Sequence, residues 1–188
     1  MNIPIVSIII VNFNVKEFLI QCIDSIHQSN FFGNIEIIVI DNHSFDGSQK
    51  ILKKQFPNII LIENQENIGF GSAVNQGAEL ASGEYLFVLN PDTIIQEDTI
   101  SVLVNYLMNH PDVGMVGPKI INSDGKLQPA CKRSFPTLKV ALPKLLGMSK
   151  LFPNSTWAGE YNLTYLDPDK IYSVDAVSGS CMLMRTDL

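Results

Sequence analysis

The stretch VSIIIVN (residues 6–12) is a nearly continuous run of β-branched residues near the start of the chain. Such a run is typical of a strand buried on both faces, as in a parallel sheet covered by helices. Three further runs of this kind follow along the chain: IEIIVID (35–41), NIILIEN (58–64) and EYLFVLN (84–90). The first stretch therefore predicts one strand of a sheet whose other strands come later in the chain.

The segments between these runs have the character of helices. KEFLIQCIDSIHQSN (16–30) repeats apolar residues every three or four positions, and SFDGSQKILKKQF (44–56) is typical of a capped amphipathic helix. GFGSAVNQGAELASG (69–83) is a small-residue segment that we also expect to be helical. Because strand and helix alternate, we predict an α/β fold with a mostly parallel sheet and helices on both faces.

Three of the predicted strands end in short polar stretches. These are NFN (12–14), DNHS (41–44) and NPD (90–92), and Asp46 follows shortly after the second. Ligands of open α/β sheets bind beyond the carboxyl ends of the strands. Turn formation alone explains polar residues at any one strand end, but three such ends at one edge predict a binding site.

The pattern changes after residue 96. Residues 97–110 predict an amphipathic helix, and residues 113–128 predict a strand followed by a hairpin. A Pro-rich, irregular region follows, and it contains the basic amphipathic piece LKVALPKLLGMSKLF (138–152). YSVDAVSGSCMLMR (172–185) predicts a last strand or strand pair broken at Gly179. We therefore expect a single domain over residues 1–188 with a smaller mixed region in its second half.

Composition limits the classes of function. The chain has 188 residues, 46% of them hydrophobic and 17% charged, with a net charge of −6. The acidic balance argues against a general nucleic-acid binder, which needs a basic face for phosphates. Three widely spaced cysteines predict neither a disulfide framework nor a zinc site. With no expected signal peptide or membrane-spanning run, we expect a cytoplasmic protein.

A nucleoside diphosphate tests what the polar edge can bind. Phe13 offers a flat face for a base, and Asp41 can accept a hydrogen bond from a base imide N–H. Asp92 is the hard oxygen ligand that Mg²⁺ or Mn²⁺ prefers, with phosphates completing the coordination shell. Asn90 could orient that shell or touch the ribose, and Pro91 stiffens the turn that carries the carboxylate. The edge thus contains the groups that a metal-bound nucleotide requires.

Each of these side chains also has a structural alternative. Phe13 could belong to the core, and Asp41 could cap a turn or a helix. Asp92 could cap the helix that begins near residue 97, and Asp46 is typical of a cap eased by the glycine after it. These alternatives stay open on sequence alone.

Five motifs resemble those of family 2 glycosyltransferases in order and spacing. They are VSIIIVNFN, IIVIDNHSFDGS, NIGFGSAVNQG, YLFVLNPDT and VSGSCMLMR, which together span roughly residues 4–188. The NIGFG and LNPDT forms resemble the rhamnosyltransferase-like branch. The resemblance implies a Rossmann-like GT-A fold, with a nucleotide-binding half (1–96) and an acceptor-side half (97–188). It also implies inverting transfer of a sugar from a nucleoside-diphosphate donor to an acceptor hydroxyl.

The resemblance further implies roles for particular residues. The resemblance makes Phe13 the aromatic that stacks on the base and Asp41 the acid that binds it, while Asn67, Gly69 and Asn75 line the nucleotide. The full set of residues implied in donor binding is Phe13, Asn14, Asp41, Asn42, Ser44, Asp46, Asn67, Gly69, Asn75, Asn90 and Asp92. Gly179 and Ser180 fall on the acceptor side. Asp92 is the expected ligand of Mg²⁺ or Mn²⁺.

Two departures from the family pattern affect the chemistry. The metal motif has Asn90 where an acid is usual, so we expect weaker or less selective metal binding. The usual general base lies in a motif beyond the last residue, Leu188, so we expect this chain to be a fragment that binds donor but transfers poorly. Asp175 is a weak candidate for the base, and a structural role at a strand end fits it better.

Other functions remain to be weighed against sugar transfer. A sugar nucleotidyltransferase needs a Gly-rich basic loop after the first strand, which VNFNVKE (11–17) lacks, and an NAD-linked fingerprint is missing too. A nucleotide-sugar-binding domain without turnover stays possible. If Asp41 binds the base, UDP or dTDP donors fit better than GDP. The expected acceptor is a saccharide or a lipid-linked saccharide in cell-surface polysaccharide synthesis. Residues 138–152 could touch the inner face of the membrane, although a core-covering helix is the plainer role.

Overall fold

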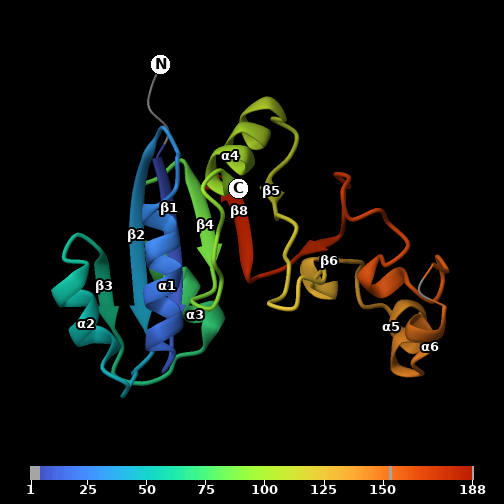
Figure 1. Ribbon diagram of the computed structural model, residues 1–188, viewed down its shortest axis with the longest axis horizontal. Helices are drawn as coiled ribbons and strands as arrows, with labels where there is room; N and C mark the ends of the chain where they lie inside the picture. The colour runs from blue at the N-terminus through green and yellow to red at the C-terminus, as the bar shows by residue number, and fades with distance from the viewer. Residues whose placement is uncertain (1–4, 153, 188) are drawn as a thin grey trace. The chain divides into compact units, whose positions relative to one another are not determined.

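A computed structural model of the chain describes residues 5–152 and 154–187 (Figure 1). The chain forms two compact units, of which the first is Met1–Val116 together with Gly179–Leu188 and the second is Gly117–Ser178. This division differs from the expected boundary after residue 96, because the next helix, a short strand and the C-terminal strand belong to the first unit. The division into a nucleotide-binding and an acceptor-side half stays a prediction.

The first unit is built on a six-stranded mixed sheet in the order β3-β2-β1-β4-β8-β5. The first four strands are parallel, β8 runs antiparallel to β4, and β5 runs antiparallel to β8. The expected α/β fold with a mostly parallel sheet is confirmed. The strands are β1 (Ile5–Asn12), β2 (Asn34–Asp41), β3 (Ile60–Glu63), β4 (Tyr85–Leu89), β5 (Met115–Val116) and β8 (Cys181–Arg185).

The central strands are buried because their side chains are apolar on both faces. Ile8, Ile9, Ile38 and Phe87 are fully buried, as the β-branched runs predict. β1 pairs with β2 along its whole length, so that Asn12 is the partner of Asp41. The polar ends of these two strands therefore lie side by side at the carboxyl edge of the sheet.

Four helices belong to the first unit: α1 (Lys16–His27), α2 (Ser48–Gln55), α3 (Phe70–Ala78) and α4 (Thr99–Asn109). The buried face of α1 carries Leu19, Cys22, Ile23 and Ile26, at the spacing the sequence predicts. The connection from β1 to β2 crosses the sheet in one direction, and the connection from β3 to β4 crosses it in the opposite direction. Because parallel crossovers are right-handed, α1 and α3 cover opposite faces (Figure 1).

The amino end of β1 is held by the buried hydroxyl of Ser7. Its Oγ donates to Oε1 of Glu36 on β2 at 2.5 Å and accepts the N–H of Gly83 at 2.9 Å. A Cβ at Gly83 would lie 2.7 Å from Ser7 Oγ and 2.8 Å from the carbonyl oxygen of Ile5. Only glycine allows the chain to approach β1 this closely.

The second unit contains short elements. β6 (Lys132–Arg133) and β7 (Ala176–Val177) form an antiparallel pair, and the helical pieces are η1 (Pro129–Cys131), α5 (Leu138–Leu145), α6 (Met148–Leu151) and η2 (Glu160–Asn162). The predicted break at Gly179 separates β7 from β8. No helix within residues 5–152 and 154–187 has the length and apolarity to cross a bilayer.

The predicted strand over residues 113–128 is shorter than expected. Only Met115–Val116 pairs as β5, and the hairpin is an isolated bridge between Ile121 and Leu127. Its turn is closed where the N–H of Asn122 donates to the carbonyl of Lys126 at 2.8 Å. Few apolar residues of this stretch are buried, so little holds a longer ladder together.

Candidate functional site

The carboxyl ends of β1 and β2 are joined by a network centred on Asp41, which is fully buried. One of its oxygens accepts Nδ2 of Asn12 at 2.6 Å. The other accepts the backbone N–H of Ser44 at 2.9 Å and Nε2 of Gln49 at 2.7 Å. These bonds hold the loop after β2 in shape, which is what the turn-capping alternative requires. Contact between Asp41 and the base stays a prediction.

Asn14 ties the loop after β1 to the loop after β2. Its φ of 54° lies in the left-handed region, which asparagine tolerates better than most residues. Its N–H donates to Oγ of Ser44 at 3.0 Å, and its side-chain oxygen accepts the N–H of Phe45 at 2.7 Å. The two loops therefore form one connected surface at the carboxyl edge.

Asp46 caps two helices at once, as expected of a cap residue. Its carboxylate accepts the N–H of Lys16, the first residue of α1, at 2.8 Å. It also accepts the N–H of Ser48, the first residue of α2, at 3.0 Å, and the hydroxyl of Ser48. Burial alone would raise the pKa of Asp46, but the hydrogen bonds from Ser48 and Lys16 outweigh it and hold the pKa below 3.8.

Replacing Asp46 with alanine is expected to lower the free energy of unfolding by about 1–2 kcal/mol, since two N-terminal caps are lost. Because the folded pKa is depressed, this contribution is present above pH 3.8 and fades as the pH falls below that value. Urea unfolding at pH 7 and at pH 3 checks both statements. A gap between Asp46→Ala and the parent that stays unchanged at pH 3 would contradict the assigned role.

The end of β4 turns sharply through Asn90-Pro91-Asp92-Thr93. The N–H of Thr93 donates to the carbonyl of Asn90 at 3.1 Å, which closes a four-residue turn with proline at its second position, where its fixed φ is favourable. The N–H of Asn90 donates to the carbonyl of Ser180 at 2.8 Å, and its Nδ2 lies 3.4 Å from Ser180 Oγ. The turn is thus fastened to the residue that precedes the C-terminal strand β8.

Asp92 stands on this turn as an exposed carboxylate. Within residues 5–152 and 154–187, no hydrogen bond or ion pair occupies its side chain, and no cluster of three or more His, Cys, Asp or Glu could hold a metal ion. One free carboxylate beside the Asn90 amide suits a Mg²⁺ or Mn²⁺ ion whose other ligands are phosphate oxygens and water. It does not suit a cage made of protein ligands alone.

Aromatic side chains are exposed at the same edge. Phe13 is 45% exposed, so the alternative that it belongs to the core is wrong. Phe45, which sequence reasoning missed, is 76% exposed and packs edge-on against His43 with ring centroids 4.6 Å apart. Phe70, at the start of α3, is also exposed. A base has several flat faces available here.

The segment before α3 is joined to the β2 loop through Asn42. The N–H of Gly69 donates to Oδ1 of Asn67 at 2.9 Å, and Gly69 has a φ of 83° that favours glycine. Asn42 is buried, with its Nδ2 3.4 Å from the Gly69 carbonyl and its Oδ1 accepting Nδ2 of Asn64 at 2.9 Å. Asn75 is exposed on α3. The structure thus joins the Asn67 and Gly69 segment to the edge.

Asp175 has a structural role in the second unit. Its carboxylate accepts the N–H of Phe135 at 3.0 Å and the hydroxyl of Ser134 at 2.8 Å, beside the β6–β7 pair. The bond from Phe135, followed by that from Ser134, lowers the pKa of Asp175. A general base needs a pKa near the working pH, so we do not propose Asp175 as the base. Leu188, beyond which a base was expected, lies outside the described residues.

Two buried thiols lie beneath the Asn90 turn. Burial raises the pKa of both Cys22 and Cys181 to about 12, and for Cys22 the neighbouring Cys181 and Asp92 add to the effect. Cys22 Sγ lies 3.6 Å from the Asn90 carbonyl oxygen. We expect both thiols of the folded protein to react with a disulfide reagent at pH 8 about 1000-fold more slowly than free cysteine.

Reaction kinetics with peptide mapping by mass spectrometry checks this expectation, and the protein unfolded in guanidinium is the control. Cys131 is buried as well, so all three thiols should appear only on unfolding. Labelling of Cys22 or Cys181 in the folded protein at the rate of free cysteine would contradict the buried placement.

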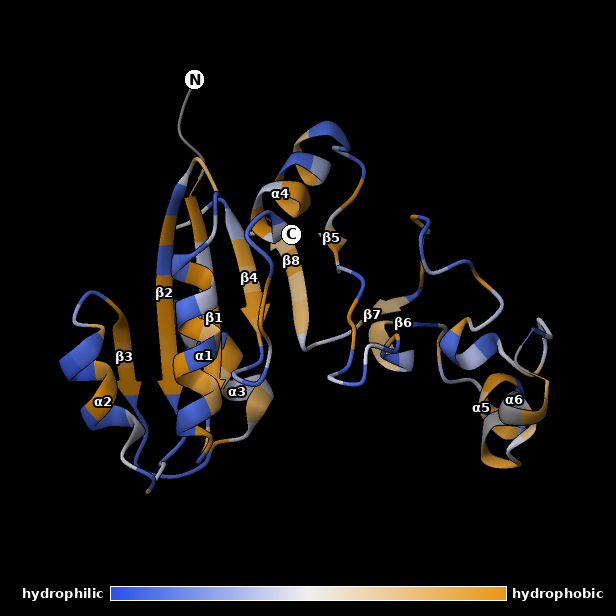
Figure 2. Cartoon of the chain, viewed as in Figure 1, coloured by the Kyte–Doolittle hydropathy of each residue, from blue (hydrophilic) through white to orange (hydrophobic). Residues whose placement is uncertain are grey.

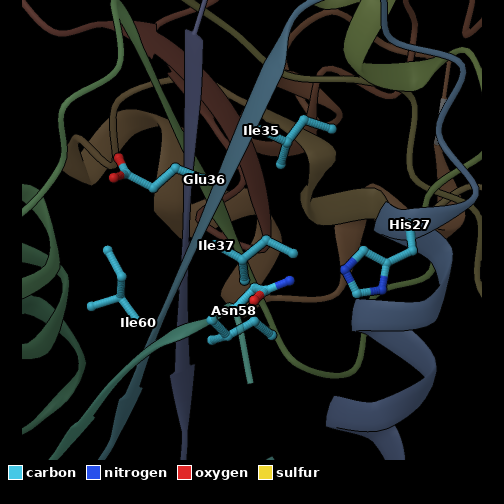
Figure 3. A pocket seen from close by; sticks show the side chains of 7 residues that line it. His27, Ile35, Glu36, Ile37, Asn58 and Ile60 are labelled. Atoms are coloured by element: carbon cyan, nitrogen blue, oxygen red, sulfur yellow. The ribbon is translucent and has the colours of Figure 1, made fainter. Parts of the chain in front are cut away.

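A cavity of about 290 Å³ lies elsewhere in the first unit (Figure 3). It is lined by His27 at the end of α1, by Ile35 to Ile37 at the start of β2, and by Asn58 to Ile60 at the start of β3. These are the amino ends of the strands, opposite to the edge that holds Asp92. Its mixed, open lining offers no group of converging titratable side chains, and we assign it no role.

Residues 7–187 match the family described as glycosyl transferase family 2. The chain belongs to that family. N-acetylglucosaminyl-diphospho-decaprenol L-rhamnosyltransferase of Mycobacterium tuberculosis is 29% identical over 162 residues, which are 80% of this chain and 52% of that protein. The family 2 chain thus spans about half the length of this curated relative.

Solved structures show that the fold of this family 2 chain is GT-A-like. S. aureus TarS 1–349 covers 99% of the chain with a TM-score of 0.62 at 18% identity, over 47% of its own length. TarS in complex with UDP-GlcNAc aligns with a TM-score of 0.59 at 21% identity, covering 74% of the chain and 41% of TarS. A mannosyltransferase of Pyrobaculum calidifontis in complex with GDP-Man and Mn²⁺ has a TM-score of 0.58 at 24% identity, covering 65% of the chain and 37% of that protein.

Proposed function

We propose that the protein to which this chain belongs is an inverting glycosyltransferase. It transfers a sugar from a nucleoside-diphosphate donor to an acceptor hydroxyl, and the donor binds at the carboxyl edge of the sheet. The observation that carries the proposal is the free carboxylate of Asp92 on a proline-stiffened turn at the end of β4. In a member of glycosyl transferase family 2, such a carboxylate is suited to a metal-bound diphosphate.

In the proposed donor site, some groups touch the ligand and others shape the loops around it. Phe13 is the proposed stacking face for the base, since it is half exposed beside Asn14. Asp41 and Asp46 are engaged with their own loops and serve to position these residues. The assignment of Asn67, Gly69 and Asn75 to the nucleotide rests on the motif that they occupy.

A divalent cation, Mg²⁺ or Mn²⁺, is part of this proposal. Asp92 would hold it, with Asn90 orienting the shell, and when bound it would neutralise the charge of the diphosphate. The Mn²⁺ complex of the structurally similar mannosyltransferase supports the choice of metal. Because Asn90 contributes no charge, we expect the chain to bind the ion weakly without nucleotide.

The preference for UDP or dTDP over GDP depends on Asp41 reaching the base. Because Asp41 is buried, the identity of the base in the donor is left undecided. Similar proteins hold UDP-GlcNAc and GDP-Man. We propose UDP- or dTDP-sugars as the first donors to test, with GDP-sugars as the comparison. The proposed acceptor is a saccharide or a lipid-linked saccharide in cell-surface polysaccharide synthesis, as the name of the decaprenol-linked relative suggests. The proposed location is the cytoplasmic face of the membrane.

A transfer assay tests the proposal. The whole protein to which this chain belongs is incubated with UDP-, dTDP- or GDP-sugars, Mn²⁺ and a polyprenyl-diphosphate-linked saccharide. Release of the nucleotide and the mass of the acceptor are followed together. We expect Mn²⁺-dependent transfer from one donor class and its loss in Asp92→Ala. Asp112→Ala is the matched control, because Asp112 is an exposed carboxylate before β5, toward the amino end of β4.

The second candidate is a nucleotide-sugar-binding domain without turnover. It is favoured by the observation that Asp175, the weak candidate for the general base, is held by hydrogen bonds from Ser134 and Phe135. Tight donor binding with neither transfer nor hydrolysis in the assay would support this candidate over the first.

A further inference from the structure

The helix α5 in the second unit presents a stripe of leucines to solvent. Leu138, Leu142 and Leu145 lie in α5 at positions i, i+4 and i+7, which share one side of a helix, and Leu146 follows directly after the end of α5. All four are exposed, Leu138 by 90% and Leu145 by 82%. Figure 2 shows the apolar colour along α5. An apolar stripe of this kind on the outside of a fold marks an interaction surface more often than chance exposure.

The other side of α5 is already used for packing. Val140 is 7% exposed and Pro143 is buried, and α5 contacts η2, near which Ala158 and Leu163 are buried. The core of the second unit therefore has its own apolar residues. The outward leucines are not needed to cover that core. A core-covering helix explains the packed side of α5 but not its exposed leucines.

The exposed stripe continues beyond α5. Leu151, at the end of α6, and Phe152, directly after it, are exposed, as is Trp157 a few residues later. The two helices contact each other. Leucine, phenylalanine and tryptophan together are the residue types that enter the boundary between lipid headgroups and acyl chains.

The sequence segment that contains the stripe has charge of one sign only. Between Asp124 and Glu160 the sequence has no acidic residue and six basic ones: Lys126, Lys132, Arg133, Lys139, Lys144 and Lys150. The whole chain has 13 Lys and Arg against 19 Asp and Glu. The rest of the chain thus has 7 basic and 19 acidic residues, a net charge of −12 against +6 for this segment. An anionic surface attracts this segment and repels the remainder.

We propose that the leucine stripe of α5, with Leu151 and Phe152, docks this chain onto an anionic lipid bilayer. The apolar side chains enter the interface, and the net positive charge of the segment between Asp124 and Glu160 attracts it to the negative headgroups. Phosphate-rich polymers would use the charge but not the leucines, and a second protein copy would use the leucines but not the charge. A bilayer with anionic lipids uses both.

A flotation assay with lipid vesicles tests the proposal without donor, metal or acceptor, so its failure is separable from failure of the glycosyl-transfer proposal. The whole chain is mixed with vesicles of phosphatidylcholine alone or of phosphatidylcholine with about 30% phosphatidylglycerol. Each mixture is measured at physiological and at raised salt concentration. We expect binding to the anionic vesicles, weak binding to the neutral ones, and a decline with salt.

Substitutions separate the two contributions. The double variant Leu138→Ser, Leu145→Ser is expected to lose at least about tenfold in vesicle affinity, because two exposed apolar side chains no longer enter the interface. Lys139→Gln is expected to lose about fivefold at low salt. Ile171→Ser, at an exposed apolar residue of the same unit, and Lys50→Gln, at an exposed lysine of the first unit, are the matched controls and should bind as the parent does.

Three results would overturn the proposal. The first is vesicle binding by the leucine double variant equal to that of the parent, with circular dichroism showing both folded. The second is equal binding to neutral and anionic vesicles. The third is no binding of the parent chain to anionic vesicles. A dimer in light scattering that the same leucine substitutions dissociate would then show that the stripe joins two copies of the chain.

Discussion

Replacing Asp41 with alanine is expected to lower the free energy of unfolding by about 3–4 kcal/mol. The carboxylate is fully buried and accepts hydrogen bonds from Asn12, Ser44 and Gln49. Its removal leaves the N–H of Ser44 without this partner and takes away charge-assisted bonds worth about 1.5–3 kcal/mol each, partly offset because Asn12 and Gln49 keep second acceptors. Guanidinium unfolding followed by far-ultraviolet circular dichroism measures the change.

The matched control for this prediction is Asp112→Ala, an exposed carboxylate in the first unit, which should change stability by less than about 0.5 kcal/mol. Circular dichroism is preferred over fluorescence because the single tryptophan, Trp157, lies in the second unit. If Asp41→Ala is as stable as the control but fails to bind nucleotide, then Asp41 reads the base and its assignment to loop positioning is wrong.

Replacing Asp92 with alanine is expected to weaken Mn²⁺-dependent binding of a nucleoside diphosphate by roughly 10- to 100-fold, the value of one lost charged contact. Stability should stay within about 0.5 kcal/mol, since the carboxylate is exposed and has no partner among the described residues. Electron paramagnetic resonance measures the signal of free Mn²⁺, and its decrease as UDP is added gives the amount of bound ion.

The variant Asn90→Asp extends this test in the opposite direction. It adds a second negative charge beside the proposed metal position, and we expect tighter Mn²⁺ binding than in the parent. The backbone N–H of Asn90 keeps its bond to Ser180, so the turn is expected to survive. Unchanged Mn²⁺ binding in both Asp92→Ala and Asn90→Asp would place the metal, if any, elsewhere.

The core of the fold could be predicted from local pattern because parallel strands buried on both faces have a distinctive composition. VSIIIVN (6–12) predicted β1 to within one residue, and the alternation with helices predicted the parallel part of the sheet. The pairing of β8 with β4 could not be predicted, because nothing local indicates that residues 181–185 return to a strand almost a hundred residues earlier. For this reason the two compact units also differ from the division after residue 96 that the sequence suggests.

The polar edge was predicted, but the roles within it were not. Carboxyl ends of parallel strands must meet at one edge, so Asn12 and Asp41 were certain to be neighbours once the sheet was known. Which of these side chains face solvent depends on partners from neighbouring helices, such as Gln49 of α2 for Asp41 and Lys16 of α1 for Asp46. The burial of Asp41 and its three hydrogen bonds could therefore not be predicted from the sequence, and its contact with the base stays a prediction.

The central claim is that the carboxyl edge of the sheet holds a metal-bound nucleoside diphosphate. A calorimetric titration of UDP and dTDP into the protein, with and without Mn²⁺ and with GDP as the comparison, tests it most directly. We expect at least one nucleotide to bind with Mn²⁺, and at least about tenfold more weakly without it. Binding of none of the three, or binding that is the same with and without Mn²⁺, would contradict the claim.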